Sequence, residues 1–288
     1  MTKLSFTTTG AWDMADGFGC ASLGLAGICG NEEKRVVSRE LPADSVVFVG
    51  SYAELLADVE ALAKRKKVHA GIVLFGNAGG ENSFLTQLQK IIACPMVGGG
   101  AAIDGATGRK GLIPGGGEAA VLLFTDDRFT YTTQTLCIHD QILKTCTVEM
   151  LDPRTVLTID GEDAAAFLAR KKAERNLEET DFEHLTLSDM DDVNAHLSFG
   201  DGHIKSGRDM HSRMKLRSVA HEKVYDTMRA FYDEEDAIVF GCAGLSGLLD
   251  RPLDTKSLGL FLFGEVCTVN GRAEFGNLML SKLKISPR

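Results

Sequence analysis

The sequence lacks the patterns that mark several large classes of protein. Hydrophobic residues make up 44% of the 288, yet no apolar run approaches the roughly 20 residues of a membrane-spanning helix. The first ten residues, MTKLSFTTTG, contain no apolar core of a secretory signal. The net charge of −9 disfavours binding to a phosphate backbone. We therefore expect no membrane partner and no nucleic-acid partner.

Cysteine pairs and common catalytic motifs are also missing. Seven cysteines occur without a CxxC pair, which argues against a disulfide framework or zinc ribbon and favours the reducing cytoplasm. The sequence has no GxxxxGK[ST], HExxH or GxSxG motif, and Gly17 and Gly19 lack the third glycine of a dinucleotide fingerprint. Five of the seven histidines lie between His184 and His221, without metal-ligand spacing. A nucleoside triphosphate, a dinucleotide or a zinc ion is therefore not expected.

What the sequence does contain is a short internal repeat. Residues 96–105, MVGGGAAIDG, resemble residues 262–271, LFGEVCTVNG. Residues 75–79, FGNAG, differ from residues 240–244, FGCAG, at one position, and the two matches have nearly the same separation along the chain. The repeat predicts two related halves.

Each copy of the longer motif has an apolar pair that runs into a glycine, and a polar residue that precedes a second glycine. The polar residue is Asp104 in the first copy and Asn270 in the second. We place the boundary between the halves so that they comprise residues 1–136 and 137–288.

Hydrophobic periodicity predicts strands and helices in both halves. Val46–Val49 reads as a short strand, and Ser51 with Glu54 forms a capping box in front of an amphipathic helix. Ile72–Phe75 is the next apolar strand and ends at a glycine. This order predicts a strand, a helix and a second strand.

The later pattern adds strands with short connections. Ala119–Phe124 and Phe129–Leu136 are joined by the turn TDDR, which predicts an antiparallel hairpin. Thr145–Glu149 and Thr155–Ile159 form a similar pair, and Phe275–Leu280 reads as another strand. The expected fold is α+β or α/β, a layered sandwich of mixed and antiparallel sheets flanked by helices, with two pseudo-repeated halves.

Glycines near predicted strand ends are the first candidate site. Gly98, Gly99 and Gly100 could present backbone N–H groups to a carboxylate or phosphate, and Gly76 and Asn77 stand in the other repeated motif. Tight turns that let sheets pack would account for the same residues. Both interpretations are open from the sequence.

Glu265 and Cys242 are the other candidates. Glu265 follows Gly264 beside an apolar strand, where a carboxylate could bind an amine, act as an acid or base, or tie down its turn with Asn270 or Asn277. Cys242 follows a strand, a place that suits a nucleophile if its pKa is lowered, although a small buried cysteine is the commoner case. The alternative to a binding protein is therefore an enzyme that uses Cys242 or Glu265 on a small carboxylated or amide substrate.

Several segments, taken in order, are similar to the FIST family, with its N-terminal and C-terminal domains. They are PMVGGGAAIDG, AAVLLF, TVEMLDPRTVLTIDGEDAAAFL, AIVFGCAG, LGLFLFGEV and EFGNLML, spread over roughly Val46 to Leu283. The resemblance implies a sensory domain that binds a small ligand, with amino acids or other small carboxylates suggested, and passes its signal to a separate protein partner. Some family members are described as heme-binding nitric-oxide sensors, which makes heme a candidate cofactor and His139 a candidate axial ligand.

The resemblance also bears on individual residues. It covers the GG-containing motif, the GE motif, the late asparagine motif and the cysteine: Gly98, Gly99, Ala101, Asp104, Gly264, Glu265, Asn277 and Cys242. After Cys242 the family's arginine-containing motif is replaced by Ala243, Gly244 and Leu245, which leaves Arg251 as the nearby cation. We expect the ligand between the two halves, against the glycine segments and Glu265.

Overall fold

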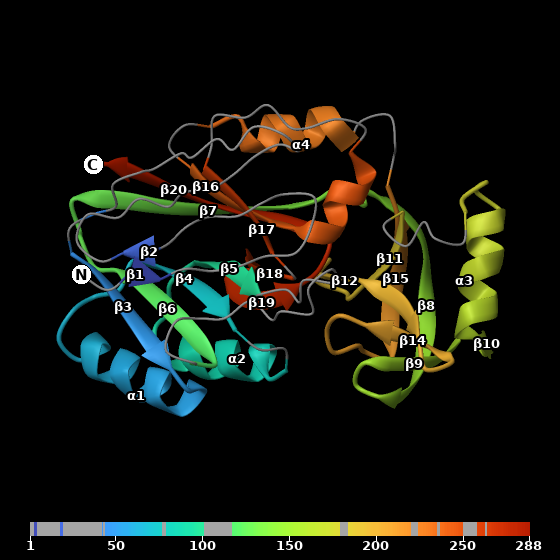
Figure 1. Ribbon diagram of the computed structural model, residues 1–288, viewed down its shortest axis with the longest axis horizontal. Coiled ribbons are helices and arrows are strands. Elements are labelled where there is room, and N and C mark those ends of the chain that lie inside the picture. Colours follow the sequence, from blue (N-terminus) through green and yellow to red (C-terminus); the bar gives the residue numbers. More distant parts are fainter. Residues whose placement is uncertain are drawn as a thin grey trace.

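Two stacked β-sheets form the larger of two lobes (Figure 1). The computed structural model describes residues 3–4, 18–19, 42, 44–76, 79–100, 117–178, 184–219, 224–234, 237–249, 258–262 and 264–288. The first sheet has six strands, in the order Arg272–Gly276 (β19), Glu265–Val269 (β18), Met96–Gly100 (β5), Ala70–Phe75 (β4), Ala119–Phe124 (β6) and Ser45–Gly50 (β3). The second has four, in the order Leu258–Leu262 (β17), Ala237–Cys242 (β16), Met279–Pro287 (β20) and Phe129–Cys137 (β7).

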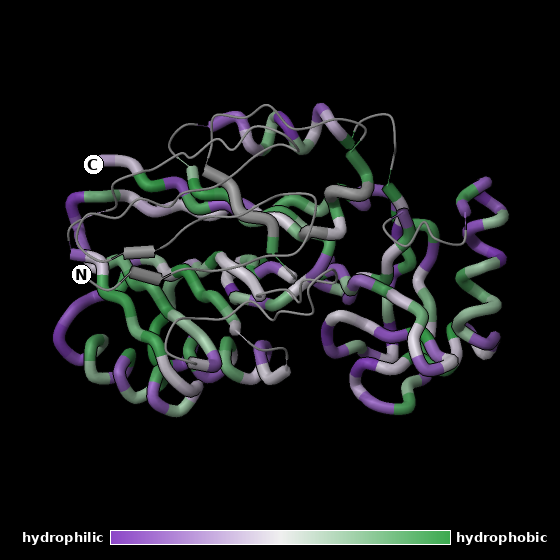
Figure 2. The backbone as a smooth tube through the Cα atoms, in the orientation of Figure 1, coloured by the Kyte–Doolittle hydropathy of each residue, from purple (hydrophilic) through white to green (hydrophobic). Residues whose placement is uncertain are grey.

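Apolar side chains from both sheets fill the space between them. Ile72 and Leu122 of the first sheet and Phe240 and Leu283 of the second belong to one buried cluster. Figure 2 shows hydrophobic residues concentrated along these strands. Burial of apolar area at about 25 cal/mol per Å² is the main force that holds such sheets together.

Helices cover the outer faces of both sheets and complete four layers. Tyr52–Ala63 (α1) and Glu81–Ile91 (α2) pack on the first sheet, and Val224–Tyr232 (α4) and the 3₁₀ helix Ala243–Leu248 (η2) pack on the second. The predicted layered α+β fold, with mixed and antiparallel sheets flanked by helices, is therefore confirmed. Among the described residues, no helix is long and apolar enough to cross a membrane.

The smaller lobe is one eight-stranded sheet with a helix against it. Seven strands run in the order Asn194–Ala195 (β12), Leu185–Ser188 (β11), Arg213–Ser218 (β15), Gln141–Asp152 (β8), Thr155–Ile159 (β9), His203–Ser206 (β14) and Leu197–Gly200 (β13), and Glu162–Asp163 (β10) pairs with β9. Ala164–Ala173 (α3) shares the core of this lobe, and the side chain of Asp163 caps the N-terminus of this helix. In the larger lobe, a short antiparallel pair, Lys3–Leu4 (β1) and Phe18–Gly19 (β2), lies near the N-terminus.

Related strand arrangements occur in the two sheets of the larger lobe. β4 is parallel to β5 and antiparallel to β6, and β16 is likewise parallel to β17 and antiparallel to β20. The repeated motifs are only partly equivalent in structure, because MVGGG is the whole of β5 whereas LFGEV spans the break between β17 and β18.

Predictions that rest on residues close together in the sequence agree with the structure. β3, α1 and β4 follow in the predicted order, and the capping box forms, with the Ser51 side chain accepting from the Glu54 amide and Glu54 accepting from the Ser51 amide. The predicted pair Thr145–Glu149 with Thr155–Ile159 is also present, within β8 and β9.

Two strand predictions are wrong. β6 and β7 are not a hairpin, because β6 pairs with β3 and β4 whereas β7 pairs with β20 in the other sheet. Phe275–Leu280 is not one strand, because residues 277–278 separate β19 from β20 and Leu278 has a φ of 52°. In both places the chain passes from one sheet to the other.

Candidate functional site

The glycine segment and the GE motif lie side by side in the first sheet. β5 and β18 are antiparallel neighbours, with Gly99 opposite Glu265 and Gly98 opposite Val266. The amide of Gly100 donates a hydrogen bond to the carbonyl oxygen of Gly264, at 3.1 Å. The structure thus brings five predicted site residues together, but as strand partners and not as two facing turns.

Close backbone packing explains why β5 is rich in glycine. Gly98 has a φ of 137°, and a Cβ atom there would lie 1.9 Å from the carbonyl oxygen of Val73. At Gly99 a Cβ atom would lie 2.2 Å from the carbonyl oxygen of Gly264. Gly98 and Gly99 lie within strand β5 and not in a turn, and neither position has room even for a methyl group, so close strand packing accounts for both glycines.

Glu265 is a buried carboxyl group in the sheet. It is 0% exposed, and its Oε2 accepts a hydrogen bond from the amide of Met279 at 3.2 Å. Oε1 accepts no well-formed hydrogen bond from the described residues, although the nearby thiol of Cys242 lowers the pKa of the carboxyl slightly. Burial dominates and raises the pKa of Glu265 well above its ordinary value, so the group is held in its neutral form.

Cys242 lies at the end of β16, against Glu265. The side chain is buried, and burial is the main cause that raises the pKa of the thiol; the acidic group of Glu265 beside it acts in the same direction. Backbone amides of Leu278, Gly244 and Gly264 act in the opposite direction without reversing the effect. Because the thiolate is the reactive form, this environment does not favour Cys242 as a nucleophile.

One histidine that the sequence did not connect with Cys242 lies in the same region. The Sγ of Cys242 and the Cδ2 of His196 are each 3.7 Å from the position of a Cβ atom on Gly244. Burial lowers the pKa of His196, so its ring is neutral at pH 7. His196 comes from the smaller lobe, and its amide donates to the Oδ1 of Asn277 at 3.3 Å. No short motif marks this proximity.

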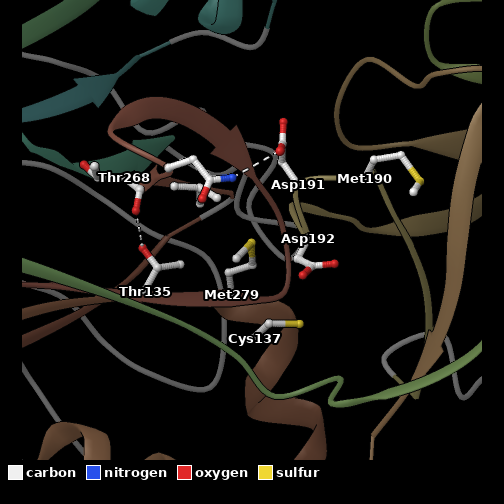
Figure 3. Close-up of a pocket in the computed structure, with 9 residues that line it drawn as sticks. Thr135, Cys137, Met190, Asp191, Asp192, Thr268 and Met279 are labelled. Atoms are coloured by element: carbon white, nitrogen blue, oxygen red, sulfur yellow. Dashed lines mark hydrogen bonds between the residues drawn. The ribbon is translucent and has the colours of Figure 1, made fainter.

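A polar pocket lies a short way along β18, where the two lobes meet (Figure 3). Its volume is about 380 Å³, within the range of roughly 300–1,000 Å³ that is usual for small-molecule sites. It is lined by Thr135, Cys137, Met190, Asp191, Asp192, Thr268, Val269, Asn270 and Met279. We call this cavity the lobe pocket. Asn270 is the one predicted site residue that lines it.

Charged groups of both signs surround the lobe pocket. Asp191 accepts hydrogen bonds from the Nδ2 of Asn270 at 3.1 Å and from Arg272 at 3.3 Å. One oxygen of Asp192, Oδ1, accepts from Lys215 and Arg217, each at 2.5 Å. Burial raises the pKa of Asp192, but Lys215 and Arg217 outweigh this and hold it below its ordinary value.

A buried ion pair fixes the loop that carries these aspartates. The Nη1 of Arg208 lies 3.0 Å from the Oδ2 of Asp189, and both residues are more than nine-tenths buried. The other oxygen of Asp189 accepts from the amides of Asp191 and Val193. These contacts therefore hold the 189–193 loop in one conformation. The sequence patterns singled out neither the loop nor its anchor.

His139 is not among the residues that line the lobe pocket. Its side chain is 0% exposed, its Nδ1 is 3.3 Å from the Nδ2 of Asn194, and its carbonyl oxygen accepts from Arg217 at 2.9 Å. A separate cavity of about 140 Å³ is lined by neighbours of His139 but not by His139 itself. Within the described part of the chain, no group of histidine, cysteine and acidic residues could hold a metal ion. The geometry of His139 gives no support to a heme site.

The remaining predicted residues divide into three groups. Gly76 is buried at the end of β4, and its amide donates to the carbonyl oxygen of Glu118 at 2.8 Å. The Nδ2 of Asn277 is 2.9 Å from the position of a Cβ atom on Gly264, next to the GE turn. Asn77, Asp104 and Arg251 lie outside the described residues.

Comparison with protein-family models and with curated proteins finds no match to the chain. The lobe pocket and the contacts around Glu265 are therefore the observations from which a function has to be argued.

Proposed function

We propose that this protein is a FIST-type sensory protein that binds a small zwitterion, such as an amino acid, in the lobe pocket. The observation that carries the proposal is a pocket of about 380 Å³ at the junction of two lobes, with the carboxylates of Asp191 and Asp192 on its walls and cations paired to those carboxylates. A ligand that contacts both lobes can change how they pack, and the change can be passed to a separate partner. The cysteine content favours the cytoplasm as the place of action.

The charges favour a ligand that carries both signs. Asp191 and Asp192 are paired with three cations, Lys215, Arg217 and Arg272, so charges of both signs lie beside the pocket. The cations are potential partners for a ligand carboxylate. The carboxylate of Asp192, which lines the pocket, is an acceptor for an ammonium group.

The walls of the pocket are fixed before a ligand arrives. Asp189 and Arg208 hold the 189–193 loop, and the Oγ1 of Thr135 donates to the carbonyl oxygen of Thr268 at 3.2 Å on the opposite wall. Binding to a preformed site costs less conformational entropy, so a small ligand can bind with measurable affinity through few contacts.

The test is a thermal-shift screen of the free amino acids and small dicarboxylates, followed by calorimetry on any compound that raises the melting temperature. The proposal expects at least one compound to bind, and the variants Asp192→Asn and Asn270→Ala to weaken its binding by about tenfold or more, the usual effect of a lost charged hydrogen bond. Asp127→Asn, on the exposed turn between β6 and β7, is the matched control and should bind like the parent. Equal binding by all three variants would place the ligand elsewhere.

A second candidate function is an enzyme acting through Cys242. The nearness of His196 is the observation in its favour, because an imidazole can take the proton of a thiol, whereas burial, which raises the pKa of Cys242, acts against it. Iodoacetamide labelling decides the point: a Cys242 thiol that reacts no faster than a free peptide thiol is not an activated nucleophile.

A further inference from the structure

Cys137 is the most accessible of the described cysteines. It is the last residue of β7 and forms part of the wall of the lobe pocket, with its side chain partly exposed. The other four described cysteines are all buried: Cys94, Cys146, Cys242 and Cys267. Of the described cysteines, Cys137 is therefore the one that a small molecule in the lobe pocket would meet.

Two hydrogen-bond donors point at the sulfur of Cys137. The Nδ2 of Asn194 is 3.2 Å from Sγ, and the Nη1 of Arg217 is 3.5 Å from it. Both donors are buried, Asn194 completely and Arg217 with 6% of its surface exposed. The Nε of Arg217 has no hydrogen-bond partner among the described residues.

A buried guanidinium is costly to place beside a neutral thiol. Its charge is compensated by Asp192, which accepts from the Nη2 of Arg217 and from Lys215, and its Nη1 also donates to the carbonyl oxygen of His139 at 2.9 Å. A sulfur species with negative charge would gain from both Arg217 and Asn194. Burial raises the pKa of Cys137, and Arg217 and Asn194 oppose this rise. The resting group is therefore a thiol, and the hydrogen-bond donors that would stabilise its anion are already in place.

We propose that Cys137 is an oxidation site that reacts with a small hydroperoxide entering through the lobe pocket. The thiol loses its proton, the sulfur attacks the terminal oxygen of the hydroperoxide, and the O–O bond breaks. The leaving alkoxide or hydroxide takes up the proton, so the products are the sulfenic acid of Cys137 and an alcohol or water. Sulfur is oxidised by two electrons and the peroxide is reduced by two.

The surroundings of the sulfur suit this product. Arg217 and Asn194 can donate to the new oxygen, as they now do to sulfur. The added oxygen would occupy part of the lobe pocket next to Asp192 and Met279, which changes the walls on which a ligand rests. Oxidation would in this way alter binding at the pocket, but the reaction itself requires the pocket and its donors, not the proposed ligand.

The experiment is treatment of the full chain with hydrogen peroxide and then with dimedone, which traps sulfenic acids, with each cysteine quantified by peptide mass spectrometry. Cys137 should be trapped about tenfold faster than Cys94 and Cys267, the buried references in the same chain, because accessible thiols in electropositive sites oxidise first. Trapping at Cys137 no faster than at those two references would overturn the proposal.

Two variants separate the donors from simple exposure. Arg217→Gln should slow trapping at Cys137 by several-fold, and Val269→Trp, which puts a bulky side chain on the pocket wall, should slow it to a similar degree by restricting access. Circular dichroism of each variant checks that it is folded. If both fold and Cys137 is still oxidised at the parent rate, neither Arg217 nor the pocket assists the reaction and the proposal fails. If Arg217→Gln does not fold, the Val269→Trp result and the parent rates decide alone.

Discussion

Gly99 lies directly opposite Glu265 across the β5–β18 ladder, so the two copies of the sequence repeat meet as neighbouring strands. The glycine has no side chain to place, and the glutamate is completely buried. This pairing joins a strand from the first half of the chain to a strand from the second. The glycines and the carboxyl are therefore first of all part of how the two halves are held together.

Gly98→Ala should destabilise the protein strongly. The new Cβ atom would lie 1.9 Å from the carbonyl oxygen of Val73, at a φ of 137° that alanine rarely adopts. We expect a loss of about 3 kcal/mol or more in the free energy of unfolding, since overpacking and backbone strain add. Gly200→Ala is the control, because a Cβ there makes only ordinary contact with Lys205, at 3.5 Å. Urea titration of both variants measures the difference, and equal stabilities would contradict the close packing of β5.

Glu265→Gln should change how stability depends on pH. Burial raises the folded-state pKa of Glu265 well above its ordinary value, so the folded protein holds this proton more tightly than the unfolded chain does. The stability that Glu265 contributes is complete below about pH 4.5 and is lost as pH rises toward the folded-state pKa. Glutamine does not titrate, so the variant should gain stability relative to the parent as the pH rises above about 4.5 and up to the folded-state pKa.

The measurement is the urea midpoint of parent and Glu265→Gln across that range. Glu274→Gln is a useful comparison, because burial also raises the pKa of Glu274 but that side chain is only half-buried, and its effect should be smaller. A constant difference between parent and Glu265→Gln at every pH would mean that Glu265 is not held neutral in the fold.

The parts of the fold that could be predicted from the sequence are those with local signals. The capping box at Ser51 and the apolar spacing behind it predict α1, and the short apolar runs predict β3 and β4. Strand partners carry no such signal. Consecutive strands are usually neighbours, and that rule gave the wrong pairing for β7, which binds β20 at the far end of the chain.

The candidate site was even less accessible to sequence reasoning. Asp191 and Asn270 are 79 residues apart in the chain but share a hydrogen bond at the pocket, and His196 approaches Cys242 from the other lobe. These contacts depend on how the lobes dock. The position of Glu265 beside an apolar strand indicates partial burial, and the structure shows the residue completely buried.

Arg208→Met should loosen the 189–193 loop. The variant leaves the buried carboxylate of Asp189 without its ionic partner. Removing one partner of a buried ion pair typically lowers the free energy of unfolding by about 3–5 kcal/mol. Hydrogen exchange should increase at the amides of Asp191 and Val193, which now donate to Asp189. Arg213→Met is the control, because Arg213 is exposed on strand β15. Unchanged exchange at both amides in a folded Arg208→Met protein would show that the ion pair does not hold the loop.

Arg154→Met should weaken the contact between the lobes. Arg154 lies in the turn between β8 and β9, and its Nη2 is 3.0 Å from the Oε2 of Glu81 at the start of α2 in the other lobe. Glu81 is 2% exposed, and without Arg154 its carboxylate would retain one described hydrogen bond, from the amide of Gly79. Because the arginine is partly exposed, we expect the free energy of unfolding to fall by about 1–3 kcal/mol, less than for a fully buried ion pair.

Asp209→Asn provides the matched control, because Asp209 binds the same arginine at 2.8 Å but its side chain is 52% exposed. Exposed ion pairs contribute about 0–1 kcal/mol, so this variant should unfold almost like the parent. Urea titration gives both free energies, and hydrogen exchange at the first turn of α2 reports the lobe contact itself. If Asp209→Asn costs as much as Arg154→Met, the arginine acts within its own lobe, and the link to Glu81 does not hold the lobes together.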